Sequence, residues 1–478
     1  MAQTSQSRHM DQVQNEAQRV FKLQRDAYLR DPYPSLADRR RWLRALDRLL
    51  IEEQEAIADA INADFGHRSA EETKMAEIFV AVEGIRDTLR HLRRWMRPQH
   101  RRTSVIFATG QSYVVPQPKG VVGIVAPWNY PLLLAIGPLT CALAAGNRTM
   151  IKLATRSQHL CRLLADKVRA VVPEEVVAFL PGVPAQEFST LPFDHLVFTG
   201  SADVGRTVMC AAAENLTPVT LELGGKSPTI IADDFDVAEA ASRILFGKLL
   251  NAGQTCIAPD YLFVPASKRD DFVAAARSIV PKRYPDVDDR SYTSIIDDKA
   301  YRRLRATLED AEAKGARPVP LLAGARFNDR LRKIPPHLVL DVSDEMRIMQ
   351  EEIFGPLLPI KTYQHLDEVI AYLGQRDRPL ALYLFSNDSA IVERMLYRTI
   401  SGGVTVNHCM FHITQHDLPF GGTGASGTGQ YHGYEGFLEL SKLRPVFHAP
   451  KIPHLDLFMP PFNDATRKLL DLVLKWAP

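Results

Sequence analysis

The feature that most constrains the fold of this chain is a regular alternation of short apolar runs with helical segments. VVGIVA, TMIKL, VVAFL and HLVFT are the first four runs, at residues 121–126, 149–153, 176–180 and 195–199. Between them lie segments with helical periodicity, such as 157–172. Strands that alternate with helices in this way lie parallel and are connected by right-handed crossovers. The sequence therefore predicts an α/β protein with a doubly wound parallel sheet.

A second series of the same kind begins at VTLEL, residues 219–223, and continues to ALYLF at 381–385. Its other strand candidates are PTIIA, YLFVP, PHLVL and LLPIK. No linker separates the two series, so we place a boundary near Thr217 from the restart of the pattern alone. A chain of 478 residues is long enough for two or three domains. The pattern therefore predicts two α/β domains in succession.

Two helices are expected before the first strand. Residues 35–64 and 70–97 carry apolar side chains at helical spacing, and Pro98 ends the second helix. In this second helix Met75 and Phe79 begin a single apolar stripe, of the kind that normally faces a core. We expect the two helices to form a layer that covers a sheet.

Composition argues against several classes of protein. The net charge of +2 gives no reason to expect nucleic acid or an acidic membrane surface as a partner. The five cysteines are scattered and form no CxxC pair, which argues against a disulfide framework and a structural zinc site and favours a cytoplasmic protein. No apolar run approaches the roughly 20 residues that span a bilayer. The polar segment 1–15 lacks the core of a signal peptide and is expected to be disordered.

A glycine-containing turn after the run 195–199 is the first candidate for ligand binding. Gly200 and Ser201 follow the strand, and Gly205 falls in the first turn of the next helix. Free backbone N–H groups and the helix dipole at such a site favour a phosphate group. The motif is not the full GxGxxG fingerprint, so an ordinary turn between a strand and a helix explains this stretch equally well.

Three further stretches contain candidate catalytic residues. In APWNYP, the amide of Asn129 could stabilise an oxyanion or simply cap a turn. In LELGGKSP, Glu222 ends a strand, where burial would raise its pKa toward that of a general base; the alternative is a salt-bridged residue at a strand end. In NAGQTCIAPD, Cys256 has small neighbours and is either a nucleophile or a buried, inert thiol.

Taken together and in this order, the motifs resemble one family. PWNYP, FTGSADVG, LELGGKSP, GQTC, EEIFGP and LPFGGTGASGTG are similar to the NAD(P)-dependent aldehyde dehydrogenase superfamily, and the resemblance covers residues 35–447. AAAENLTPVTLELGGKSP and YHGYEGFLELSKLRPVF look most like the coniferyl aldehyde dehydrogenase branch, close to the class 3 enzymes. The resemblance implies two doubly wound Rossmann-type domains and a small β bridging region.

The resemblance also assigns roles to residues. Cys256 would attack the aldehyde carbonyl, Asn129 would hold the oxyanion, and Glu222 would activate the water that hydrolyses the thioester. This chemistry oxidises an aldehyde, hydrophobic or aromatic in this branch, to a carboxylic acid with NAD or NADP. Cofactor contacts are expected at Trp128, Lys152, Gly200, Ser201, Gly205, Glu352 and Phe354.

Domain organisation and association follow from the same resemblance. The extended segment 104–118 and the stretch after residue 430 would form the bridging region of a homodimer. The apolar C-terminal tail would dock on its own domain, lie on a partner subunit or cross the mouth of the substrate site. The implied divisions are a disordered segment 1–15, a cofactor-binding domain 16–217, a catalytic domain 218–403, a return to the first domain 404–447 and a tail 448–478.

Two stretches depart from the family pattern. Thr155, in KLAT, stands where an acidic residue often repels a 2′-phosphate, and Arg156 follows it. We therefore expect NADP to be accepted, and the sequence leaves open which cofactor is preferred. In VNHCMFH, His408 replaces a usual aspartate, and His412 and His416 follow at helical spacing. Here we expect a polar wall of the substrate entrance rather than a metal site.

Other uses of the same fold fit these residues less well. CoA-acylating dehydrogenases and phosphate-linked semialdehyde reductases resemble the chain at the cysteine but generally lack the glutamate, so Glu222 argues against both. A non-enzymatic binding or structural role is disfavoured because the cysteine, the glutamate and the asparagine occur together.

Overall fold

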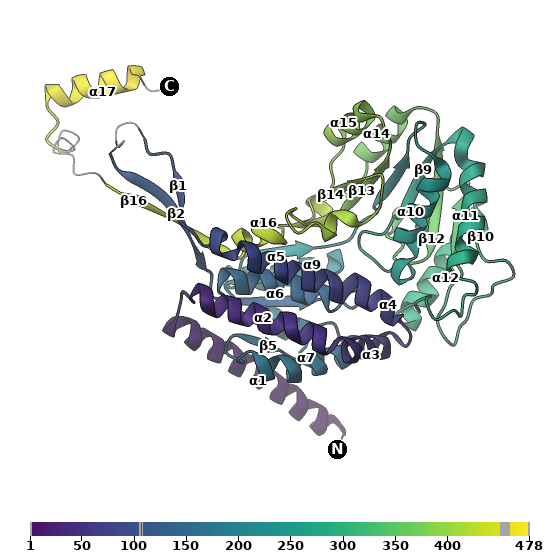
Figure 1. The fold of residues 1–478 in the computed structure, drawn as a ribbon, viewed down its shortest axis with the longest axis horizontal. Helices are drawn as coiled ribbons and strands as arrows, with labels where there is room; N and C mark the ends of the chain where they lie inside the picture. The colour runs from purple at the N-terminus through teal and green to yellow at the C-terminus, as the bar shows by residue number, and fades with distance from the viewer. Residues whose placement is uncertain (1, 105–106, 108, 450–458, 477–478) are drawn as a thin grey trace. The chain divides into compact units, whose positions relative to one another are not determined.

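The structure is a computed structural model that describes residues 2–104, 107, 109–449 and 459–476. The chain divides into two compact units (Figure 1). The larger unit consists of Met1–Trp95 and Gln117–Lys442, and the smaller one of Met96–Pro116 and Leu443–Pro478. The larger unit contains both α/β sheets, and the smaller one is built around a three-stranded sheet.

The first sheet of the larger unit has six strands in the order β15-β7-β6-β3-β4-β5. Its strands are β3 (Val121–Ala126), β4 (Arg148–Leu153), β5 (Val177–Phe179), β6 (His195–Thr199), β7 (Val219–Glu222) and β15 (Gly427–Thr428). All pairings are parallel except that of β15 with β7. Every residue of β3 and β4 is buried, as expected of strands covered on both faces. The four strands predicted in the first series are confirmed.

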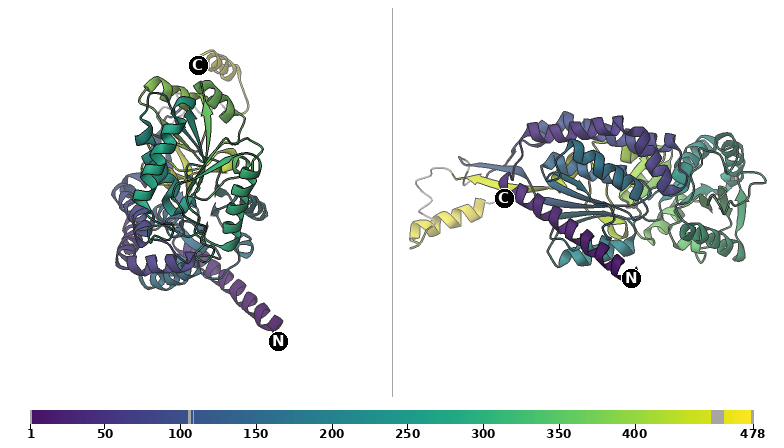
Figure 2. Two further views of the ribbon diagram at one scale, coloured as in Figure 1. Left: turned by 90° about the vertical axis from the view of Figure 1, so that its right-hand side faces the viewer. Right: turned by 90° about the horizontal axis from the view of Figure 1, so that it is seen from below.

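The second sheet has seven strands in the order β10-β11-β12-β9-β8-β13-β14. Its strands are β8 (Pro228–Ile231), β9 (Tyr261–Pro265), β10 (Arg317–Pro320), β11 (His337–Leu340), β12 (Leu357–Tyr363), β13 (Ala381–Phe385) and β14 (Gly403–Val406). Only β10 runs antiparallel to its neighbour. Two mainly parallel sheets with helices on both faces confirm the predicted doubly wound α/β architecture (Figure 2).

The boundary between the two sheets differs from the predicted one. Strand β7 was expected to open the second series, but it pairs in parallel with β6 and belongs to the first sheet. The change of sheet falls between Glu222 and Pro228, and β14 extends the second sheet beyond residue 403. A restart of the strand–helix pattern shows where a new strand begins, but the hydrogen-bond partner of that strand is a tertiary property.

Helices cover the sheets. The helices of the first domain after β3 are α6 (Leu133–Ala145), α7 (Gln158–Val171), α8 (Ala185–Ser189), α9 (Ala202–Ala213) and α16 (Gly433–Glu439). Those around the second sheet are α10 (Val237–Leu249), α11 (Arg269–Arg283), α12 (Asp298–Ala313), α13 (Arg347–Gln350), α14 (Leu366–Gly374) and α15 (Ser389–Arg398). Helix α6 is buried along nearly its whole length because it packs on β3 and β4 and is itself covered by α2 and α5.

The N-terminal layer contains helices that the sequence predicted in part. Its elements are α1 (Ala2–Arg30), α2 (Leu36–Glu52), α3 (Gln54–Phe65), α4 (Ala70–Thr73), the π-helix η1 (Lys74–Phe79) and α5 (Val80–Trp95). Helix α1 includes residues that we expected to be disordered, and from residue 16 onward it packs against the first sheet. Ser35 and Asp38 form a capping box at the start of α2.

The predicted apolar stripe of residues 70–97 is interrupted by the π-helix. Val82 and Ile85 are buried, but Met75 is 46% exposed and Phe79 is 62% exposed. A π-turn contains one residue more than an α-turn, so it shifts the phase of the side chains that precede α5. The expectation of one continuous core-facing stripe is therefore wrong at its start, and the displaced side chains face a cavity described below.

The smaller unit contains a three-stranded sheet in the order β1-β2-β16 and one helix. Its elements are β1 (Gln99–Arg101), β2 (Gln111–Pro118), β16 (Ser441–His448) and α17 (Asp464–Trp476). This sheet joins two segments that the sequence predicts to form a bridging region, although positions 105, 106 and 108 lie outside the described residues. So does part of the predicted tail, 450–458. No helix in the described parts of the chain is both long and apolar enough to cross a membrane.

Candidate active site

Cys256 lies in a loop between the 3₁₀-helix η3 (Leu250–Gly253) and β9. The backbone of Asn251, Ala252 and Gly253 is left-handed, with φ of 53°, 51° and 75°. At Gly253 a Cβ would lie 2.4 Å from the carbonyl oxygen of Gly355, so only glycine fits there. The sharp turn places Cys256, which is half-buried, at the wall of a cavity.

That cavity has a volume of about 360 Å³ and an apolar wall. Among the described residues that line it, none is charged. The residues that line it are Met75, Ala76, Phe79, Val80, Tyr130, Leu133, Leu134, Phe246, Leu250, Thr255, Cys256, Ile257, Met410, Phe411, Ile413, Thr414 and Gln415. A thiol at the wall of an apolar cavity of this size is a typical arrangement for a small organic substrate. Sequence reasoning missed these walls because they come from four separate segments.

Glu222 is the last residue of β7 and is 1% exposed. Neither carboxylate oxygen makes a hydrogen bond of good geometry. Burial therefore raises the pKa of Glu222 well above its usual value, and the nearby backbone amide of Gly422 offsets this rise only in part. Burial also raises the pKa of the Cys256 thiol to about 12, and the negative charges of Glu352 and Glu222 add to the shift. The structure therefore brings the predicted cysteine and glutamate into one site.

Asn129 is buried in the loop after β3 and points toward the cysteine loop. Its side-chain Nδ2 donates a hydrogen bond of 3.1 Å to the backbone carbonyl of Gln254, two residues before Cys256. The neighbouring Tyr130 bonds Thr255 through their hydroxyls at 2.8 Å. The predicted oxyanion residue and the predicted nucleophile are thus joined by direct hydrogen bonds between their loops.

A second cavity, of about 300 Å³, lies where β6 and β7 end and α9 begins. Of the predicted cofactor residues, Ser201 and Glu352 line it, and Ser201 is the N-cap of α9. Two glycines let the backbone pack closely against neighbouring side chains here. A Cβ on Gly224 would lie 2.3 Å from Oε2 of Glu352, and one on Gly205 would lie 2.8 Å from Leu223. Free helix N–H groups beside such a cradle fit the phosphates of a dinucleotide.

The remaining predicted cofactor residues do not line this cavity. Gly200 packs its backbone on the Phe198 ring, where a Cβ would lie 2.6 Å away. Trp128 and Phe354 form an edge-to-face pair with centroids 5.5 Å apart. Lys152 is buried on β4, where its ammonium donates to the Leu153 carbonyl at 2.9 Å.

Basic side chains in the second cavity were missed by sequence reasoning. Lys226, Arg206, Arg376 and Arg378 line it and would favour an anionic ligand. They come from three different segments, and only Lys226 lies in a quoted motif, LELGGKSP, where it was not assigned to the cofactor. Lys226 also forms an ion pair with Asp260 and donates to two backbone carbonyls of the segment before Glu352.

The histidines of the stretch 408–416 occupy separate environments. Only Phe411–Thr414 is helical, so the three rings do not share a helix face. His408 stacks on Phe411 with centroids 3.9 Å apart, and His412 bonds the Thr405 hydroxyl at 2.8 Å. The cavity wall contributed by this stretch is mainly apolar, which corrects the expected polar wall. Across the described residues, no group of three or more potential ligands could hold a metal ion.

Comparisons with known proteins agree with this geometry. The model of the aldehyde dehydrogenase family matches residues 2–446. A probable coniferyl aldehyde dehydrogenase of Pseudomonas aeruginosa is 49% identical over 459 residues, which cover 95% of this chain and 96% of that protein. Aldehyde dehydrogenase family 3 member B1 of Homo sapiens is 38% identical over 435 residues, covering 90% and 91%.

Among solved structures, the substrate-bound state of AldH from Staphylococcus aureus superposes with a TM-score of 0.89 at 33% identity, covering 96% of this chain and 99% of that one. The resemblance to the coniferyl aldehyde dehydrogenase branch and to class 3 is confirmed by these relatives. Because the family model and the relatives match nearly its whole length, the chain belongs to the aldehyde dehydrogenase family and is an NAD(P)-dependent enzyme that oxidises aldehydes to acids.

Proposed function

We propose that the substrate is a hydrophobic, aromatic aldehyde of the coniferyl aldehyde type. The observation that carries this proposal is the uncharged cavity beside Cys256, whose walls include the rings of Tyr130, Phe246 and Phe411. Aromatic walls favour a flat aromatic substrate through stacking and burial of apolar surface. The name of the Pseudomonas aeruginosa relative supports the same class.

In the first half of the proposed reaction, Sγ of Cys256 attacks the carbonyl carbon. The thiol proton passes to solvent water, because the thiolate is the attacking species. The carbonyl oxygen becomes the oxyanion of a thiohemiacetal, which the amide of Asn129 and the backbone N–H of Cys256 stabilise. Glu222 takes no part in this half and stays available as the base of the second.

Loss of hydride from the thiohemiacetal leaves a thioester on Cys256, and NAD(P), when bound, would supply the hydride acceptor. In the second half, Glu222 takes a proton from water as the water oxygen attacks the thioester carbon. The C–S bond breaks, the thiolate of Cys256 leaves, and the carboxylic acid is released. The N-terminus of α9 at Ser201, together with Arg206 and Arg378, would hold the anionic part of the cofactor in the second cavity.

A panel of aldehydes tests the substrate class. With NAD or NADP present, kcat/KM for coniferyl aldehyde or cinnamaldehyde is expected to exceed that for acetaldehyde by at least about tenfold, because the small substrate leaves most of the apolar wall uncovered. Phe411→Ala should lower the ratio of kcat/KM for the aromatic aldehydes to that for acetaldehyde by about tenfold, mainly because KM for the aromatic substrates rises. Leu418→Ala is the matched control, since Leu418 is 47% exposed and does not line the cavity. Equal kcat/KM values across the panel would refute the substrate class.

We also propose that NADP is accepted alongside NAD. Thr155 removes a like-charge repulsion, and Arg156 beside it is half-exposed while it pairs with Asp297 at 2.7 Å. Arg156→Ala should raise the Kd of NADP about tenfold and change that of NAD less than twofold. Asp297→Asn should lower the Kd of NADP, because it frees the Arg156 guanidinium from its ion pair. The helix should stay intact, since Asn can cap α12 as Asp297 does. Cofactor titration by protein fluorescence measures both constants, and an NADP to NAD ratio of kcat/KM far below one would contradict the proposal.

A homodimer remains an expectation from the family resemblance, and a cytoplasmic location remains one from the scattered cysteines. The mass of the native protein in solution, measured by light scattering, checks the homodimer.

A further inference from the structure

The loop that carries Cys256 holds an unfavourable backbone conformation. Asn251 and Ala252 are both left-handed, with φ of 53° and 51°. A left-handed residue with a Cβ is disfavoured, and alanine lacks the polar side chain by which asparagine tolerates this region. The native packing around these residues therefore has to hold the turn in place.

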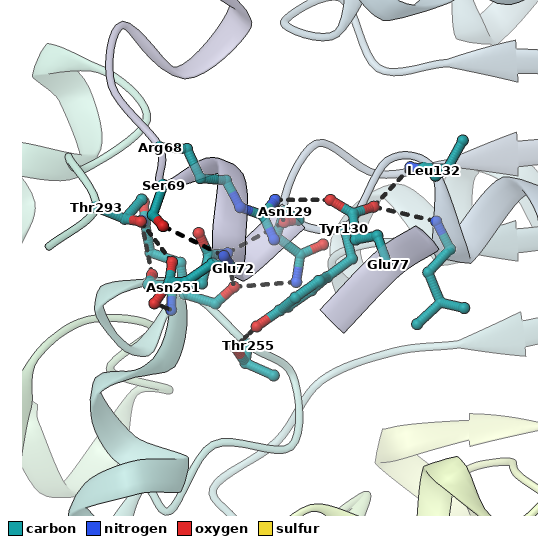
Figure 3. A network of polar contacts seen from close by, with 12 residues as sticks. Arg68, Ser69, Glu72, Glu77, Asn129, Tyr130, Leu132, Asn251, Thr255 and Thr293 are labelled. Atoms are coloured by element: carbon teal, nitrogen blue, oxygen red, sulfur yellow. Dashed lines mark hydrogen bonds and ion pairs between the residues drawn. The ribbon is translucent and has the colours of Figure 1, made fainter. Parts of the chain in front are cut away.

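Glu72, at the end of α4, provides a direct contact to this turn (Figure 3). Its Oε1 accepts a hydrogen bond of 3.1 Å from the backbone N–H of Asn251, and its Oε2 accepts one of 2.6 Å from the Thr293 hydroxyl. The backbone N–H of Glu72 donates to the Ser69 hydroxyl at 3.3 Å, which fixes the start of its own helix. The carboxylate therefore joins the N-terminal helical layer to the cysteine loop.

The side chain of Asn251 bonds the loop of Asn129, the predicted oxyanion residue. Its Nδ2 donates to the backbone carbonyls of Asn129, at 3.1 Å, and of Gln254, at 3.2 Å. The side-chain amide of Asn129 donates to the same Gln254 carbonyl at 3.1 Å. A change in the Asn251 turn would therefore move both Asn129 and the peptide units that lead to Cys256.

Arg68 supplies the counter-charge of the network. Its Nη1 lies 2.8 Å from Oε1 of Glu77, in an ion pair with both side chains fully buried, and also donates to the Asn129 carbonyl at 2.9 Å (Figure 3). Glu77 in turn accepts the backbone N–H groups of Leu132 and Leu133 at 2.8 and 3.1 Å, at the start of α6. Burial raises the pKa of Glu72 and Glu77, and the charge of Arg68 opposes both shifts.

We propose that Glu72 is a positioning residue of the oxidation. Through the N–H of Asn251 it holds the left-handed turn, and the turn holds Cys256 and the amide of Asn129 in one arrangement around the reacting carbonyl. Glu72 itself does not line the substrate cavity, so it acts through Asn251. The inference rests on the proposed function, which assigns the roles of Cys256 and Asn129.

Three variants separate positioning from a general effect on stability. Glu72→Ala is expected to lower kcat about 10- to 100-fold and to change KM less than about twofold, because the substrate cavity is intact while the reacting groups are displaced. Glu72→Gln should keep kcat within about threefold of the wild type, since its amide oxygen still accepts the Asn251 N–H. Thr293→Val is the matched control: it removes the other hydrogen bond of the same carboxylate and should leave kcat unchanged.

A second readout uses the protein without cofactor. The rate of Cys256 alkylation by iodoacetamide, followed on its own peptide by mass spectrometry, should change at least about fivefold in Glu72→Ala and stay constant in Glu72→Gln and Thr293→Val. The exposed Cys210 is an internal standard whose rate should be equal in all variants. If Glu72→Ala does not fold, Glu72→Asp takes its place, because it keeps the charge but withdraws the acceptor by one methylene.

The results distinguish a failure of the positioning role of Glu72 from a failure of the proposed function. Wild-type kcat in Glu72→Ala, or in Glu72→Asp where it stands in, would overturn the positioning role, as would equal losses of kcat in Glu72→Gln and Glu72→Ala. Turnover by Cys256→Ser would instead refute the proposed function, and the Glu72 variants would still be judged by their alkylation rates.

Discussion

Cys256→Ser is expected to lower kcat for aldehyde oxidation by about 10⁴-fold or more while the protein stays folded. A serine hydroxyl stays protonated near neutral pH and attacks the carbonyl weakly. It also forms an ester, from which the serine alkoxide leaves less readily than the cysteine thiolate leaves a thioester. Cys256 is half-buried at a cavity wall, so the exchange of sulfur for oxygen leaves the surrounding packing nearly unchanged. Initial rates of NAD(P)H formation with a cinnamaldehyde measure the effect.

The control for this experiment is another cysteine in the same chain. Cys210 is exposed on α9 and away from the cavity, so Cys210→Ser should retain full activity. Cofactor binding by Cys256→Ser, measured by fluorescence titration, should be intact because the cofactor cavity does not include the cysteine. Steady-state turnover by Cys256→Ser within tenfold of the wild type would show that this thiol is not the nucleophile.

Glu222→Gln is expected to separate the two halves of the reaction. The variant should release about one NAD(P)H per active site in a burst and then turn over about 10²- to 10⁴-fold more slowly than the wild type, because glutamine cannot accept a proton from the hydrolytic water. The acyl thioester should accumulate on Cys256, where intact-protein mass spectrometry detects the added mass. Unchanged steady-state turnover, or a slow phase without a thioester, would remove Glu222 from its role.

The same substitution has a predictable effect on stability. Burial raises the folded-state pKa of Glu222 above its unfolded value, so the carboxyl destabilises the folded state as pH rises above the unfolded pKa. Glutamine carries no such penalty, and Glu222→Gln should therefore unfold at a higher temperature than the wild type at neutral pH. The wild-type rate of thioester hydrolysis should rise with pH through the raised pKa and then level off, since the base must be ionised to act.

Several features of the fold follow from local sequence and were predicted correctly, whereas the catalytic roles stay predictions. The parallel strands of the first series are short apolar runs between helices, and such runs are local properties of the chain. The predicted nucleophile and base, Cys256 and Glu222, lie in compact motifs at the ends of secondary-structure elements, and the structure brings both to one site. The resemblance that these motifs carry is confirmed by the family match.

Other features depend on contacts between distant segments. The pairing of β7 with β6 rather than with β8 depends on hydrogen bonds between strands, which no periodicity records. Met75 and Phe79 follow a helical stripe in the sequence, yet a π-turn directs them to the substrate cavity. The pattern of apolar residues cannot show such a change of phase, because it specifies spacing along the chain and not the hydrogen-bond register of the helix.

By itself, the sequence determined the α/β class, the motif order and the chemical types of the proposed reacting residues, because these depend on periodicity and on short stretches of chain. Only the tertiary structure decided which charges are buried together. Glu72, from a charged helical segment, has no motif, and only the tertiary fold brings its carboxylate to the backbone N–H of Asn251. Burial and long-range pairing determine the electrostatics of such groups, and both arise only when segments far apart in the chain meet.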